Sequence, residues 1–176
     1  QVCQEQNIPI TGQELWDLWK PLEIQFRNDR HQYSYSFKSY EQAWRECFEC
    51  VFEGLGKGNA VAAARLSVRD QARRDVYPES GKVIDSVRRA DGLGLGLLSN
   101  ADKDALYPLL RRHGLEFDAV LCSEEARAYK PDAKVFNQII LGLEVPADEC
   151  LYVGDSQFDD VMGANGVGMK TAWVNR

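Results

Sequence analysis

The segment Leu151-Tyr152-Val153-Gly154-Asp155-Ser156-Gln157-Phe158-Asp159-Asp160 decides the fold, because a short apolar run ends abruptly in a glycine and three carboxylates. Such a run is typical of a buried parallel strand whose carboxyl end opens onto a ligand site. Hard oxygen ligands suit Mg²⁺. An aspartate that caps the next helix explains one of these carboxylates but not all three. The segment therefore predicts a magnesium site at this strand end.

Short apolar runs alternate with amphipathic stretches on both sides of this segment. The pattern predicts strands at 94–98, 119–122, 150–153 and 170–174, and helices at 80–89, 103–113, 133–141 and 158–165. This alternation is typical of an α/β fold, a Rossmann-like parallel sheet wound with helices. The glycines at 92, 94 and 96 lie before or inside a strand, not in a strand-to-helix turn, so they do not indicate a dinucleotide site.

Residues 1–76 have a different, helical periodicity, and we expect a separate helical domain there, followed by an α/β domain at 77–176. Thr11 with Glu14, and Ser39 with Gln42, resemble capping boxes. The first helix is expected to end at Pro21, the second to run from Tyr40 to the glycines after Phe52, and the third to cover 60–74. Trp16, Trp19, Trp44 and Tyr40 could line a pocket, but they recur at helical spacing and are expected in the core.

Two other strand ends carry polar residues. Ser99-Asn100 can hydrogen-bond an anion, but the same residues can serve to start the helix after Asp102. Lys130 stands ahead of a helix that Pro131 and Asp132 are sufficient to start. The lysine is not needed for that start, and it adds positive charge to a helix N-terminus that already favours anions.

Composition excludes several classes of function. The 176 residues carry a net charge of -6, which gives no electrostatic footprint for nucleic acid or an anionic membrane. No apolar run is long enough to cross a bilayer, and the first residues do not form a signal peptide, so we expect a cytoplasmic protein. The five cysteines and two histidines fit reduced thiols, and Cys47 and Cys50 are expected to be two helical thiols and not a zinc or redox motif.

These features together resemble the haloacid dehalogenase (HAD) superfamily of hydrolases. Leu98-Ser99-Asn100 resembles its second motif, Lys130 its third, and Gly154-Asp155-Ser156 through Asp160 its fourth, in the same order and with similar spacing. The resemblance covers 77–176. The helical residues 1–76 resemble the small cap that many members place over the active site.

The resemblance implies a two-step hydrolysis in which an aspartate attacks phosphorus or carbon and water then releases the product. It assigns Ser99 and Asn100 to substrate binding, Lys130 to neutralising the nucleophile and phosphate, Asp155 to Mg²⁺, and Asp160 to orienting Lys130 or a metal-bound water. Asp159 is expected to have a minor role. Dehalogenases of this superfamily typically have serine where Asp155 stands, so the expected function is a Mg²⁺-dependent phosphatase acting on a small phosphate ester, with a 2-haloacid dehalogenase as the alternative.

The family's first motif, an apolar strand followed by Asp-x-Asp-Gly-Thr, does not occur in the sequence. In the resembling fold this strand supplies the nucleophile and lies at the centre of the sheet, between the strands that end at Ser99 and Asp155. We therefore expect the central strand to be missing and the α/β domain to be incomplete. One hypothesis is that the chain is a piece of a longer protein. The other is a non-catalytic scaffold that binds phosphate or Mg²⁺. The sequence carries no signal for oligomeric state.

Overall fold

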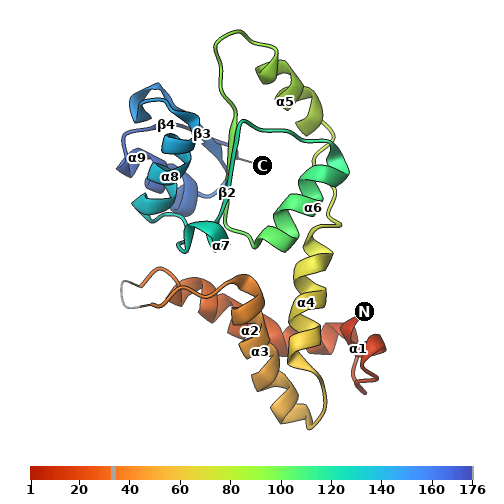
Figure 1. Cartoon of the computed structure of the whole chain (residues 1–176). Coiled ribbons are helices and arrows are strands. Elements are labelled where there is room, and N and C mark those ends of the chain that lie inside the picture. The colour runs from red at the N-terminus through yellow and green to blue at the C-terminus, as the bar shows by residue number, and fades with distance from the viewer. Residues whose placement is uncertain (33–34, 176) are drawn as a thin grey trace.

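A computed structural model describes residues 1–32 and 35–175, in which a helical part precedes an α/β part (Figure 1). The helical part consists of α1 (Val2–Glu5), α2 (Gly12–Asp29), α3 (Tyr40–Leu55) and α4 (Ala60–Gln71). The α/β part consists of α5 (Ser80–Arg88), β1 (Gly96–Ser99), α6 (Lys103–His113), β2 (Ala119–Cys122), α7 (Ser123–Ala126), α8 (Ala133–Leu143), the 3₁₀ turn η1 (Ala147–Glu149), β3 (Leu151–Gly154), the π-helical turn η2 (Gln157–Met162), α9 (Gly163–Gly166) and β4 (Lys170–Trp173). The α/β class with a helical cap is confirmed.

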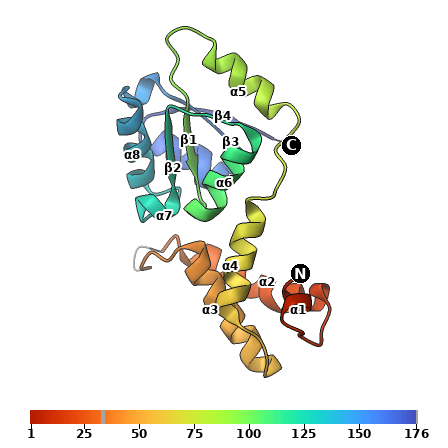
Figure 2. The ribbon, with the colours of Figure 1, turned by 45° about the vertical axis from the view of Figure 1, so that its right-hand side comes forward.

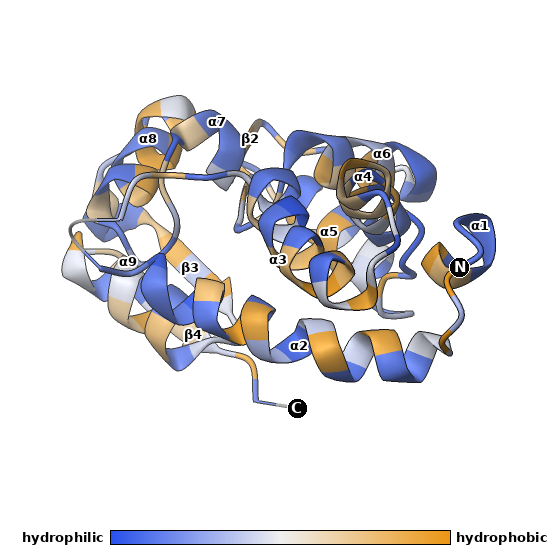
Figure 3. Ribbon diagram, turned by 90° about the horizontal axis from the view of Figure 1, so that it is seen from below, coloured by the Kyte–Doolittle hydropathy of each residue, from blue (hydrophilic) through white to orange (hydrophobic). Residues whose placement is uncertain are grey.

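Helix α2 begins at the expected capping box but does not end at Pro21. The Thr11 hydroxyl accepts from the Glu14 amide, and the Glu14 carboxylate accepts from the Thr11 amide at 2.7 Å. A proline inside a helix costs about 3 kcal/mol. Buried side chains on both sides of it, among them Trp19 and Phe26, each contribute roughly 1.5–3 kcal/mol. Packing therefore carries the helix past Pro21, and Figure 3 shows apolar and polar residues alternating along it.

Helices α3 and α4 close the helical core. The expected capping box of Ser39 and Gln42 starts α3, which ends at Gly56 in the left-handed conformation (φ 64°). Trp19 and Trp44 are buried in this core, as expected, and their rings meet edge to face with centroids 5.5 Å apart. Trp16 is 49% exposed, so its assignment to the core was wrong.

Strands β1 and β2 form a parallel pair in which Gly96 lies opposite Ala119 and Ser99 opposite Cys122. Alternate side chains point to opposite faces. Leu98 packs against the α8 side, and Leu97 packs with the apolar residues of α6. The pair is thus covered on both faces, with α6 and α8 on either side (Figure 2).

Strands β3 and β4 form a second parallel pair, with Gly154 opposite Trp173. One face packs on α8 through Tyr152, whereas Leu151 and Val153 on the other face are 61% and 59% exposed. The two pairs are separate sheets, and among the described residues no strand lies between β1 and β3. The expected single sheet is therefore in two pieces, divided at the position expected for the central strand.

The two parts contact each other through an aromatic cluster. Phe26 and Ala43 of the helical part pack with Tyr129 of the α/β part, and Ala105 of α6 joins the helical core. No helix in the described ranges is long and apolar enough to span a membrane.

Candidate active site

A cavity of about 760 Å³ lies between the two parts, within the size range of small-ligand sites. Every residue expected to act in the site lines it: Ser99, Asn100, Lys130, Asp155 and Asp160. They come from the carboxyl ends of β1 and β3 and from the loop before α8, which is where parallel strands place ligand-binding residues.

Lys130 and Asp160 form a buried ion pair in the lining of this cavity. Lys130 Nζ donates to Asp160 Oδ1 at 2.5 Å and to the Tyr152 hydroxyl at 3.0 Å. The side chains of Lys130 and Asp160 are 12% and 4% exposed. An ammonium group has three protons to donate, and these contacts use two. The third can reach a ligand in the cavity.

The pKa of Asp160 reflects two opposed effects. Burial acts to raise it, but the charge and hydrogen bond of Lys130, together with the amide of Ser156 that donates at 2.9 Å, hold it below its ordinary value. Asp160 is therefore an anion that orients Lys130. Burial also raises the pKa of Tyr152, which stays a neutral phenol that can donate to Asp160.

Gly154 permits this arrangement by having no side chain. A Cβ at this position would lie 2.5 Å from the Cβ, Cγ and Oδ2 of Asp160. The next turn is fixed by Ser156, whose hydroxyl accepts from the Asp159 amide at 3.0 Å. Glycine thus lets the backbone of β3 approach the carboxylate that holds Lys130.

Asn100 braces the site, whereas Ser99 is free. Asn100 Oδ1 accepts from the Lys130 amide at 2.8 Å, and its Nδ2 donates to the Lys130 carbonyl at 3.3 Å. The Ser99 hydroxyl forms no side-chain hydrogen bond among the described residues. The substrate role expected of both residues stays a prediction, and the geometry leaves Ser99 the freer of the two to bind a ligand.

The three carboxylates after β3 do not gather around one point. Asp160 is paired with Lys130, and Asp159 Oδ2 accepts from Arg30 at 3.0 Å. Asp155 is exposed and has no side-chain partner in the described part of the chain. No group of three or more His, Cys, Asp or Glu side chains within those residues is arranged to hold a metal. Mg²⁺ commonly takes one or two protein carboxylates and completes its shell with water and phosphate, and Asp155 fits that requirement.

Sequence reasoning missed four residues of this region: Arg30, Asp102, Tyr152 and, in its importance, Asp159. Tyr152 stands two residues before Gly154, on the strand face that meets α8, so its position could have been inferred from strand alternation. Arg30 carries no such signal, because its partner Asp159 is 129 residues away in the chain.

The family model for the haloacid dehalogenase-like hydrolase matches residues 27–174. The chain is 33% identical over 138 residues to a phosphoserine phosphatase of Thermus thermophilus, covering 77% of this chain and 54% of that protein, about half its length. It is 29% identical over 181 residues to an (S)-2-haloacid dehalogenase of Pseudomonas sp. strain YL, covering 99% and 74%. The HAD-hydrolase YfnB of Bacillus subtilis, solved bound to magnesium, has a similar fold, with a TM-score of 0.77 at 20% identity over 99% of this chain and 78% of that one.

Proposed function

The chain belongs to the haloacid dehalogenase-like hydrolase family, and from that premise we propose that its cavity is the active site of a Mg²⁺-dependent phosphatase for a small phosphorylated metabolite. The nucleophilic aspartate of this reaction is not among these 176 residues. The observation that carries this proposal is the Asp155 carboxylate, which has no side-chain partner among the described residues and lines the same cavity as the Lys130–Asp160 pair. Likeness to a phosphatase and to a dehalogenase is comparable. Our preference for the phosphatase therefore rests on the carboxylate at position 155, a ligand type that Mg²⁺ prefers.

The chain's own residues supply the anion-binding half of the reaction. Lys130 has one N–H donor left after its two hydrogen bonds, the Ser99 hydroxyl has no hydrogen-bond partner among the described residues, and both residues line the same cavity. Lys130 neutralises a phosphoryl oxygen or the attacking carboxylate, and Asp160 orients the ammonium group. Asp155 would hold Mg²⁺, which, when bound, stabilises negative charge on the phosphate.

The helical side of the cavity favours an anionic substrate. The lining residues from the helical part and the segment just after it include four cations and two carboxylates: Lys20, Arg27, Arg30, Arg74, Glu23 and Asp70. Arg30 is paired with Asp159, and Lys20 and Arg27 with Glu23, so Arg74, which forms no ion pair among the described residues, is the cation left to attract an anion into the cavity. This supports a small phosphate ester as the ligand.

The first experiment measures binding, because it does not depend on the nucleophile. Calorimetric titration with Mg²⁺ in the presence of inorganic phosphate should show binding that Asp155→Ala weakens by about tenfold or more. Asp148→Ala is the matched control, since Asp148 is an exposed aspartate outside the cavity. Equal Mg²⁺ affinity in the wild-type chain and Asp155→Ala would contradict the metal assignment.

The second experiment measures turnover of p-nitrophenyl phosphate with Mg²⁺. The free edges of β1 and β3 suggest adding a synthetic peptide with an apolar strand followed by Asp-x-Asp-Gly-Thr. Turnover that requires this peptide, and is lost when its first aspartate is replaced by asparagine, supports the proposal. Binding of Mg²⁺ and phosphate without turnover under either condition supports the non-catalytic scaffold.

A 2-haloacid dehalogenase is the second candidate, favoured by relatives named (S)-2-haloacid dehalogenase that align with 99–100% of the chain. Its test is halide release from 2-chloropropionate in the presence of a metal chelator, with the same peptide added. Halide release that is unchanged by Asp155→Ala would replace the phosphatase proposal.

A further inference from the structure

Arg30 is a buried cation at the boundary between the helical part and the α/β part. It follows α2 as its C-terminal cap, and its side chain is 2% exposed. A buried charge is costly unless it is paired and hydrogen-bonded. The groups that pair with Arg30 and offset the cost of burying its charge therefore indicate its role.

Two of the three site loops, those after β3 and before α8, contact this guanidinium directly, and the loop after β1 is linked to it through Tyr40. Asp159, after β3, accepts from Nη2 at 3.0 Å. Tyr129, just before the site lysine, places its ring 4.7 Å from Cζ. The hydroxyl of Tyr40 accepts from Nη1 at 2.5 Å, and the amide of Tyr40 donates at 2.8 Å to Asp102, which follows β1.

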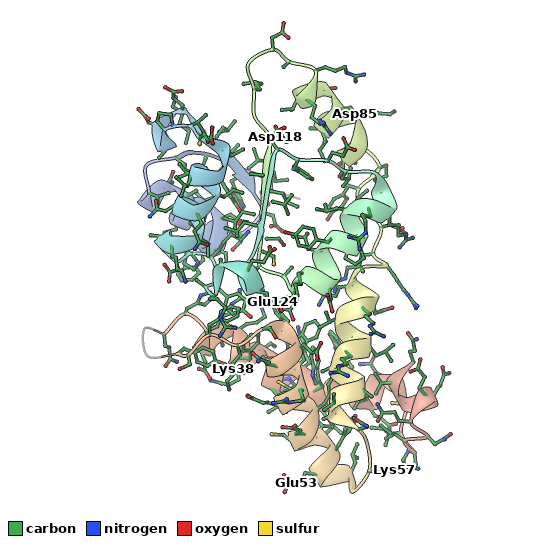
Figure 4. The ribbon with its side chains drawn as sticks, in the orientation of Figure 1. Lys38, Glu53, Lys57, Asp85, Asp118 and Glu124 are labelled. Carbon is green, nitrogen blue, oxygen red and sulfur yellow. The ribbon has the colours of Figure 1, made fainter. Side chains whose placement is uncertain are left out.

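The same loops are fastened to the helical part by two further contacts. The Tyr129 hydroxyl donates to the Lys38 carbonyl at 2.7 Å, and Figure 4 shows Lys38 where the helical part faces the α/β part. Asp102 accepts a second bond from the Glu41 amide at 2.7 Å. Arg30 therefore sits at the point where all three site loops meet the helical part.

We propose that Arg30 is a positioning residue that holds the loop at 154–160 in its binding geometry by neutralising Asp159. Asp159 Oδ2 is also 3.4 Å from the Asn100 amide, and its Oδ1 is 3.6 Å from His31 Nε2. Burial, and next the charge of Arg30, lower the pKa of His31, so in the wild-type chain Arg30 is the main counter-charge of Asp159. Without Arg30, Asp159 would be a largely buried anion beside Asp155 and Asp160.

Loss of Arg30 should therefore move the loop, not merely loosen the fold. Asp159 would turn towards water, and the hydrogen bond that its backbone amide donates to the Ser156 hydroxyl would be lost. Ser156 in turn donates to Asp160, so the disturbance reaches the Lys130–Asp160 pair. The expected consequence for phosphate binding rests on the proposed function, whereas the consequence for the loop does not.

The test compares Arg30→Met with Arg65→Met by hydrogen exchange. Arg65 is the control, because it pairs with Glu41 at 3.1 Å inside the helical part and its side chain is 60% exposed. Arg30→Met should speed exchange at 154–160 by about tenfold, the factor for 1.4 kcal/mol, and weaken binding of inorganic phosphate by a similar factor. Arg65→Met should change neither, and Arg30→Lys should lie between.

The double variant Arg30→Met/Asp159→Asn separates positioning from general stability. Removing the unpaired carboxylate should restore most of the protection at 154–160, because the charge that drives the loop away is gone. A role in packing alone would give no such rescue. Unchanged exchange at 154–160 in Arg30→Met, or no rescue in the double variant, overturns the inference. Absence of phosphate binding in the wild-type chain contradicts the proposed function instead.

Discussion

Replacing Lys130 by methionine removes the cation from a buried ion pair and keeps most of the side-chain volume. Breaking such a pair by deleting one partner costs about 3–5 kcal/mol, because the other charge stays buried. Asp160 keeps two donors, the Ser156 amide at 2.9 Å and the Tyr152 hydroxyl at 3.2 Å. We therefore expect the low end of that range, a loss of about 3 kcal/mol in the free energy of unfolding.

The double variant Lys130→Met/Asp160→Asn should be more stable than Lys130→Met alone. The amide at 160 carries no charge and can still accept from Ser156, so the loss relative to wild type should be about 1 kcal/mol. Urea unfolding followed by circular dichroism at 222 nm measures all three chains. Lys134→Met is the control, because Lys134 is an exposed lysine on α8. A double variant as unstable as Lys130→Met would refute the buried-charge reasoning.

The pH dependence gives an independent check. In the wild-type chain the folded pKa of Asp160 lies below its unfolded value, so its contribution is present above the unfolded pKa and is lost as pH falls through the folded one. In Lys130→Met, burial acts without the lysine and raises that pKa, so this variant gains stability as pH falls from 7. The difference between the two chains should shrink between pH 7.5 and 4.5. A difference in free energy of unfolding that is constant over this range contradicts the assignment of Asp160 as a buried anion paired with Lys130.

Three further predictions concern single positions. Gly154→Ala would place a Cβ 2.5 Å from Asp160 and should lower stability by about 1–3 kcal/mol, whereas Gly166→Ala, with nothing within 4 Å, should not lower it in the same thermal melts. Burial raises the pKa of Asp102 to about 6, so wild type should gain about 2 kcal/mol over Asp102→Asn as pH falls from 7.5 to 4.5 in urea titrations, opposite in sign to Asp160; a constant difference contradicts the raised pKa. Thr11→Ala should cost about 1 kcal/mol through loss of the α2 cap, and helicity and melting temperature equal to wild type would contradict this.

Elements set by local signals could be predicted from the sequence. Both capping boxes start the helices that they were expected to start, and the ranges expected for α6 and β2 agree with the structure. The end of α2 could not be predicted, because the local penalty of Pro21 is outweighed by side chains that pack against α3 and α4. When tertiary packing sets the end of a helix, the local sequence at that end does not show where it lies.

The convergence of the site was predictable for a similar reason. The rule that ligands bind at the carboxyl ends of parallel strands uses only the order of strands and the residues that follow them. It correctly brought Ser99, Lys130 and Asp155 to one cavity. The rule says nothing about which side chains pair there, so it could not show that Asn100 braces the Lys130 backbone.

The carboxylates show most clearly where sequence reasoning ends. Asp102 stands at the start of α6, where a local rule makes it the cap of that helix, yet its carboxylate bonds to the first amides of α3 in the helical part. The carboxylate of Asp159 is a possible metal ligand by residue type, but its ion pair with Arg30 makes it a contact between the two parts. In both cases the partner lies far away in the chain and the chemistry of the residue follows from that partner. Substitutions in the helical part should therefore alter the site at the end of β3 without touching any residue of its motifs.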